Sequence, residues 1–186
     1  MADTRPTYDH HDRFFNRELS WLLFNWRVLE EAENRNHPVM ERLRFLSISA
    51  SNLDEFYMVR YAGLREQVRA GIQRVSQDGL TPAQQTARIE QETKALMKAQ
   101  QQCWKRLKKE LAAEGLKIVS PEKLTKSDKA WLDKTFEFEI FPILTPLAVD
   151  PAHPFPFIAN RGFALAMALE PLGAGDPMTG LSLIHI

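Results

Sequence analysis

The stretch TPAQQTARIEQETKALMKAQQQCWKRLKKELAAEG, residues 81–115, decides the fold. Thr81 can cap a helix, Pro82 suits its first position, and Gln84 stands where a capping box needs it. Apolar side chains then recur at helical spacing as far as Gly115, namely Ile89, Leu96, Cys103, Leu107 and Leu111. At about 1.5 Å per residue the stretch predicts a rod of roughly 45–50 Å. A rod of that length, polar over most of its girth, is typical of an elongated antiparallel bundle.

Shorter helices are expected before this rod. Asn16 is a good N-cap for the first, which carries a wide apolar face on both sides of Trp26 and should be core. Residues 34–36 break the pattern, and Pro38 suits the first position of a second, short helix. We expect that helix to end in the small polar run 47–51, whose side chains compete for backbone hydrogen bonds.

A third helix is expected to begin at Ser51 or Asn52. Asn52 can cap it, and Glu55 stands three residues later, as a capping box requires. Gly71 is a plausible residue for its C-terminal stop. Asp54 and Glu55 resemble a paired-carboxylate site, but neighbours on a helix point about 100° apart. Stabilisation of the helix dipole in the first turn is the better interpretation of this pair.

Composition changes after Gly115. Residues 116–119 are interpreted as a short strand, Ser127 as the cap of a helix over 128–141, and residues 162–169 as a strand of alternating large and small side chains. The final LSLIHI, residues 181–186, suits either an edge strand of an unfinished sheet or a non-native tail of a truncated reading frame, and we favour the tail. The predicted organisation is a disordered segment 1–12, a helical domain 13–118, a partial α/β domain 119–180 and that tail.

Charge and composition exclude several classes of protein. The chain has 24 basic and 24 acidic residues, so its formal net charge is zero, which argues against a nucleic-acid-binding surface. No segment is long and apolar enough for a membrane span, and the N-terminus lacks the apolar core of a signal peptide. Cys103 is the only cysteine, which excludes an internal disulfide and suits the cytoplasm.

Three blocks of sequence carry a resemblance to a known family. They are FNRELSWLLFN at 15–25, ERLRFL at 41–46 with SNLDEFYMVR at 51–60, and LTPLAVD at 144–150 with HPFP at 153–156. In this order they resemble the bacterial polyphosphate kinases that work through a phosphohistidine. The resemblance covers residues 14 to about 170. It leaves out the first dozen residues and the last six.

The resemblance implies a fold and a function. It implies an all-α N-terminal domain, a spectrin-repeat-like bundle that contacts the adenine end of ATP, followed by a truncated α/β head domain that helps to form a homo-oligomer. The phosphoacceptor histidine and the Mg²⁺ ligands would lie in later domains. The implied reaction is reversible transfer of the terminal phosphate of ATP to polyphosphate, in the cytoplasm or in a membrane-associated complex.

Asn52 has two interpretations. Its residue type and position favour a helix cap, although an amide also offers the donor and acceptor that a purine edge needs. The resemblance aligns Asn52 with the family's nucleotide-contacting asparagine, which makes ATP binding the preferred role, and one residue could serve both roles.

Arg60, Arg65 and Arg69 have two interpretations as well. Arg60 and Arg65 are candidates for steering phosphate, but the interleaved Glu66 and the zero net charge favour a solvated, salt-bridged face. No histidine has the setting of a phosphoacceptor, and no pair has the helical spacing of metal ligands. We therefore expect no catalytic residue and no metal ligand in this chain.

Two hypotheses for the whole chain remain open. It is either the N-terminal fragment of a polyphosphate kinase or a self-standing helical module that binds a partner through its long helix. Residues 121–186 hold too few elements to close a sheet around a core, which favours the fragment. Because phosphoryl transfer needs a nucleophile and metal-held phosphates, the fragment alone should be inactive.

Overall fold

The computed structural model describes residues 10–149, 155–158, 162–169 and 178–184. The chain divides into two compact units, residues 1–118 and 119–186, hereafter the helical unit and the α/β unit. The prediction of a mainly helical chain is confirmed. No helix among the described residues is both long and apolar enough to cross a membrane.

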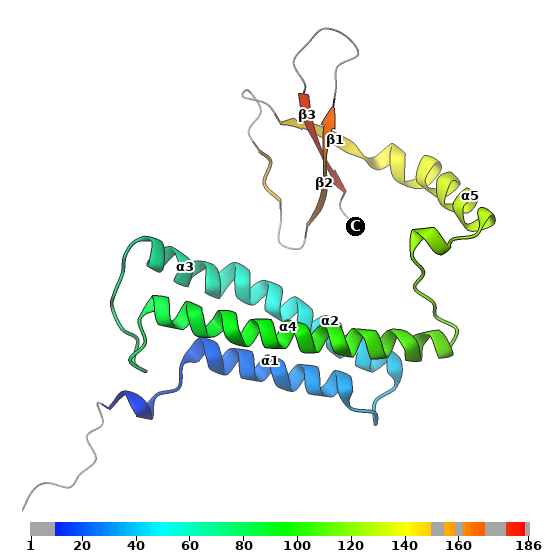
Figure 1. The fold of residues 1–186 in the computed structure, drawn as a ribbon. Helices are drawn as coiled ribbons and strands as arrows, with labels where there is room; N and C mark the ends of the chain where they lie inside the picture. Colours follow the sequence, from blue (N-terminus) through cyan, green and yellow to red (C-terminus); the bar gives the residue numbers. More distant parts are fainter. Residues whose placement is uncertain (1–9, 150–154, 159–161, 170–177, 185–186) are drawn as a thin grey trace, which may run out of the picture. The chain divides into compact units, whose positions relative to one another are not determined.

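The helical unit consists of helices that pack along their lengths. Its elements are a 3-10 turn (His11–Arg13), α1 (Arg17–Glu33), α2 (Val39–Glu55), a π-helical turn (Phe56–Tyr61), α3 (Ala62–Arg69) and α4 (Pro82–Ala113). Figure 1 shows α1, α2 and α4 side by side, with the chain direction reversing at each connection. With its 32 residues α4 is about 48 Å long.

Most helix ends follow the local signals of the sequence. The Asn16 side chain accepts hydrogen bonds from two backbone amides of α1, and Thr81 forms the predicted capping box with Gln84. Gly71 and Gly115 have φ angles of 69° and 86°, the left-handed conformation that glycine adopts without strain. After Gly115 the chain closes α4 with a hydrogen bond from the Leu116 amide to the Leu111 carbonyl, at 2.9 Å.

The predicted helix start at Asn52 is wrong. α2 runs without interruption from Val39 to Glu55 and continues through the π turn into α3, so Asn52 lies in a helix interior. It therefore caps nothing, and Asp54 and Glu55 lie in the last turn of α2 rather than in a first turn. The polar run 47–51 stays helical because the buried Ser49 has partners in the other helices instead of competing for its own backbone.

One apolar core joins the helices of this unit. Phe56 is 1% exposed, and the α4 side chains contribute a continuous buried stripe, which consists of Ile89, Leu96, Cys103, Leu107 and Leu111. Burial of each Leu or Phe side chain stabilises the fold by about 1.5–3 kcal/mol. Trp21, Trp26 and Trp104 pack against this core, as their positions on apolar helix faces predict.

The α/β unit has one short helix and a small sheet. Its elements are a 3-10 turn (Pro121–Lys123), α5 (Lys126–Thr135), a π turn (Phe136–Ile140), a 3-10 turn (Phe141–Ile143) and strands β1 (Thr145–Val149), β2 (Phe163–Leu169) and β3 (Met178–Ile184). The sheet is antiparallel in the order β1-β3-β2, with Leu147 opposite Leu181 and Ala166 opposite Leu181 on its other side.

The sequence-based expectations for this unit have mixed outcomes. The strand at 162–169 is confirmed as β2. No strand forms at 116–119, because these residues follow α4 as an extended link without a partner strand in the described chain. The cap of α5 is Thr125 rather than Ser127, because Thr125 and Asp128 form a capping box two residues earlier.

Residues 181–184 belong to β3; their origin as a tail stays a prediction. Most of the expected disordered segment, residues 1–9, and the motif residue His153 lie outside the described residues.

Candidate functional site

Three side-chain pairs cross the seam between α1 and the long helix formed by α2 and the π turn. Arg60 and Glu18 form an ion pair at 3.3 Å, and Trp21 stacks on Phe56 with ring centroids 4.9 Å apart. In the third pair the Asn52 amide donates to Asn25, at 3.4 Å. The α1 members recur at three-and-four spacing and the facing members at fourfold spacing, so each set shares one helix face. We call this row the α1–α2 seam.

A chain of buried amides and hydroxyls leads inward from Asn52. Asn52 Nδ2 donates to Asn25 Oδ1, and Asn25 Nδ2 donates to the Ser49 carbonyl at 3.0 Å. From the other side Gln100 Nε2 of α4 donates to Ser49 Oγ at 2.9 Å. Asn25 and Ser49 are 0% exposed, where an unsatisfied polar group would cost about 1–3 kcal/mol. The network therefore fixes the register of the three long helices relative to one another.

Asn52 lies at the outer end of this network. Its side chain is half-buried, and Asn25 is its one hydrogen-bond partner among the residues the structure describes. Its Oδ1 accepts no hydrogen bond from them. Ile48, one turn earlier on the same helix face, is an exposed apolar side chain. An acceptor beside an exposed apolar surface is the pair of features that a purine base needs.

The two candidate arginines differ in their surroundings. Arg60 is bound by Glu18, so its positive charge is largely compensated. Arg65 is exposed and forms no ion pair with a described residue, because Glu66 pairs with Arg69 at 3.4 Å instead. The salt-bridged interpretation therefore holds for Arg60 and Arg69, while Arg65 keeps an uncompensated charge.

The π turn between α2 and α3 directs two tyrosines at α4. Tyr57 shares a hydrogen bond of 2.7 Å with Thr93, and Tyr61 donates to Glu90 at 2.5 Å. Burial, followed by the adjacent Glu90 carboxylate, raises the pKa of Tyr61 above its ordinary value, so the phenol stays protonated. Single π turns inside helices are frequent at functional sites, and this one directly follows the turn that carries Asn52.

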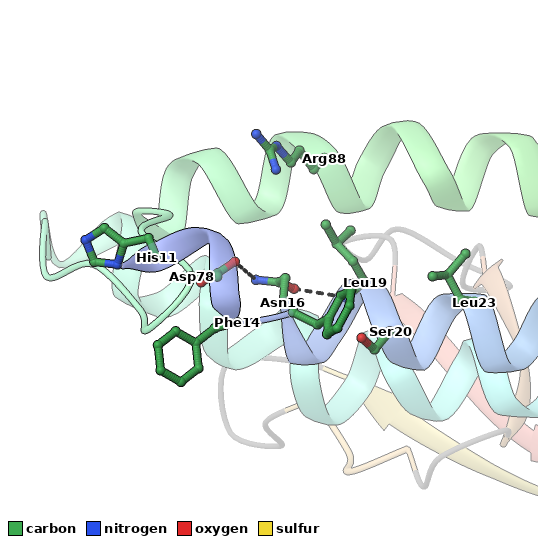
Figure 2. A pocket seen from close by; sticks show the side chains of 9 residues that line it. His11, Phe14, Asn16, Leu19, Ser20, Leu23, Asp78 and Arg88 are labelled. Carbon is green, nitrogen blue, oxygen red and sulfur yellow. Dashed lines mark hydrogen bonds between the residues drawn. The ribbon is translucent and has the colours of Figure 1, made fainter. Parts of the chain in front are cut away.

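A hollow of about 280 Å³ lies beside the start of α1. Figure 2 shows Asn16 bridging two parts of the chain there: its Oδ1 accepts from the α1 backbone, and its Nδ2 donates to Asp78 at 2.9 Å. Burial alone would raise the pKa of Asp78, but hydrogen bonds from Ser76 and Asn16 lower it below the ordinary value. Arg88 lines the hollow and forms no ion pair with a described residue, and none of Asn52, Arg60 and Arg65 lines it.

The described residues contain no group of three or more His, Cys, Asp or Glu side chains that could hold a metal ion. The exposed carboxylates Asp54 and Glu55 belong to no such group. The described residues therefore do not fit a Mg²⁺ site.

The sequence singled out Asn52 as a candidate but not Asn25, Ser49 and Gln100, which form the network behind it. A signal for Asn25 was present, because it falls on the buried face of α1 at the spacing 22–25–29–32, between Leu22 and Leu29. A polar residue at such a position needs a buried partner. The partner could not be named from sequence, since Asn25 lies 27 positions from Asn52 and 24 from Ser49.

Two family models match the chain. The one described as "Polyphosphate kinase N-terminal domain" matches residues 14–119, and the one described as "Polyphosphate kinase middle domain" matches residues 127–186. Together they take in nearly all of the chain that follows residue 13.

Individual proteins give the same picture. The chain is 48% identical to a protein named polyphosphate kinase from Erythrobacter litoralis and 47% identical to one from Prosthecochloris aestuarii. These alignments cover 98% and 92% of this chain but 25% and 24% of those proteins. A crystal structure of polyphosphate kinase from Porphyromonas gingivalis matches with a TM-score of 0.67 and 30% identity, over 91% of this chain and 24% of that one. The chain thus spans about a quarter of the length of the relatives it matches.

Proposed function

Because this chain belongs to the polyphosphate kinase family, we propose that it acts as the N-terminal part of an enzyme that reversibly transfers the terminal phosphate of ATP to polyphosphate. The matched models are those of the N-terminal and middle domains, which supports this assignment. In the proposal the helical unit is an elongated, spectrin-repeat-like bundle that contacts adenine. The α/β unit is the beginning of a head domain.

The observation that carries the adenine contact is the position of Asn52. A buried network holds its amide from the inside, while its oxygen remains open to a ligand. A side chain held in this way loses little conformational freedom when the base binds, which favours affinity. The exposed Ile48 on the same face would cover part of the purine ring.

Phosphate steering is proposed for Arg65 before Arg60. An arginine without a carboxylate partner attracts an anion without first giving up an ion pair. Arg60 would have to leave Glu18, or would act through the ion pair as a support for the seam. Both residues follow Asn52 on the same long helix, at distances of two and nearly four turns.

The remaining parts of the proposal rest on the family resemblance. They are a homo-oligomer formed through the head domain, a cytoplasmic location, and Mg²⁺ held outside this part of the enzyme. In the same proposal the 186-residue chain alone makes no polyphosphate, and detection of polyphosphate synthesis from ATP by the purified chain would overturn that point.

The test of the adenine contact is an ATP titration of full-length enzyme with the substitution Asn52→Ala. Loss of one ligand hydrogen bond of about 1–1.5 kcal/mol should raise the Kd for ATP about tenfold. Asn36→Ala is the matched control, because Asn36 is an exposed asparagine in the turn before α2 and lies away from the seam. Equal ATP affinity in wild type and Asn52→Ala would remove Asn52 from the site.

A further inference from the structure

The direction of the Asn25 amide is fixed by a backbone carbonyl. A carbonyl oxygen can only accept a hydrogen bond, so the Asn25 atom that lies 3.0 Å from the Ser49 oxygen must be Nδ2. The other end of the amide, Oδ1, then faces Asn52. Because Asn25 is fully buried within the core, reversing this amide would place two oxygens against each other away from water.

The orientation of the Asn25 amide in turn determines the orientation of the Asn52 amide. The oxygen of Asn25 requires a donor, so Asn52 presents Nδ2 inward at 3.4 Å. The Oδ1 atom of Asn52 is then at the opposite end of its amide and has no partner among the described residues. An asparagine can in general offer a ligand either a donor or an acceptor. Here the buried network uses one of the two N–H groups of Asn52 and leaves its oxygen as an acceptor without a described partner.

We propose that Asn25 is a positioning residue that holds Asn52 as a hydrogen-bond acceptor, so that the site selects purines with an amino group at carbon 6. The inference rests on the proposed adenine contact and deepens it. Adenine carries a donor amine at this position, whereas hypoxanthine and guanine carry an acceptor oxygen. A purine of the second kind would bring oxygen against oxygen, and Asn52 could turn its amide only by breaking its bond to Asn25.

The wild-type enzyme gives the first test, which needs no substitution. Full-length enzyme is titrated with ATP, with ITP, which has an oxygen at carbon 6, and with purine riboside triphosphate, which has only hydrogen there. The expected order of affinity is ATP, then purine riboside triphosphate, then ITP, with about tenfold between the first and the last. Equal affinity for ATP and ITP would overturn the proposal.

The second test substitutes the positioning residue, Asn25. Asn25→Leu has nearly the same shape but leaves Asn52 free to turn, so the ATP-to-ITP preference should fall by about fivefold to tenfold. The matched control is Gln100→Leu, which removes the hydrogen bond to Ser49 Oγ but leaves the Ser49 carbonyl and the Asn25 amide in place.

The outcomes separate the inference from the proposed function. If Asn25→Leu lowers the melting temperature but keeps the wild-type preference, Asn25 is structural only and the inference is wrong. An equal loss of preference in Gln100→Leu contradicts it as well, because a general loosening would then explain both. If Asn52→Ala binds ATP as tightly as wild type, the proposed adenine contact itself fails.

Discussion

The helical unit and the α/β unit use the same local devices with different results. Each has a helix with a Thr-based capping box, and each has a helix that continues into a π turn. In the helical unit the π turn buries Phe56 against α1. In the α/β unit the side chains of Trp131 and Phe138 are 65% and 67% exposed, and none of residues 119–144 is buried. Local sequence thus makes helices in both units, but only facing helices make a core.

The largest expected effect tests this contrast directly. Phe56→Ala should lower the free energy of unfolding by about 3–5 kcal/mol, because it leaves a cavity in the core. Trp131→Ala removes a larger but exposed side chain and should change the free energy of unfolding by less than about 1 kcal/mol. Urea titrations of the two variants, followed by circular dichroism, compare them. Similar losses would mean that Trp131 is covered in solution and that the contrast between the units is wrong.

A buried charge should give a smaller effect. Arg42 is 7% exposed; its guanidinium pairs with Glu110 at 2.5 Å and donates to the Ala32 carbonyl at 3.0 Å. Arg42→Met should cost about 2 kcal/mol, since it leaves that carbonyl unsatisfied and half-exposed Glu110 without a partner.

The matched control for Arg42 lies on the surface of the same unit. Arg69 also pairs with a glutamate, but its side chain is 77% exposed, and Arg69→Met should cost less than about 0.5 kcal/mol. The measurement is again the urea midpoint. A loss at Arg69 as large as that at Arg42 would show that burial does not decide the energy of these pairs.

The smallest expected effect is on the stability of the helical unit at acid pH. The lowered pKa of Asp78 means that its carboxylate stabilises the folded state above the ordinary aspartate pKa, about 3.9, and that this stability is lost as pH falls through the lowered value. Asp78→Asn should therefore flatten the fall in stability of the helical unit between about pH 5 and pH 2.

Asp128 of the α/β unit is the comparison for Asp78. The hydrogen bond with Thr125 lowers the pKa of Asp128 too, but this bond closes only a local capping box. Asp128→Asn should leave the acid dependence of the helical unit unchanged. Unfolding curves over a pH series distinguish the two, and an equal flattening in both variants would contradict the tertiary role given to Asp78.

The sequence predicted those features that depend on neighbours along the chain. Helix ends could be predicted at four residues, because the hydrogen bonds that cap them come from residues within a few positions along the chain. These residues are Asn16, Thr81, Gly71 and Gly115. The junction at Asn52 was misjudged for the opposite reason. Its local signals favour a helix start, but Ser49 is held inside the helix by partners from α1 and α4, and this tertiary gain overrides local preference.

The candidate site divides in the same way. Asn52 could be singled out by its residue type and by resemblance, whereas its supporting partners come from elements 27 and 48 positions away, Asn25 and Gln100. Pairing between such distant residues is set by the packing of whole helices. One sequence without aligned relatives carries no direct signal of it.

The π turn at 56–61 also limits how the length of this chain can vary. A π turn accommodates one residue more than an α-helical turn, so the residues after it are rotated by about 100° relative to an uninterrupted α-helix. Replacing the π turn by a regular α-helix of the same length would turn Tyr61 and Leu64 away from α4, whereas deleting one residue within 56–61 would remove the extra residue and keep Leu64 facing α4. A one-residue insertion that a surface loop tolerates would here rotate α3 relative to α2.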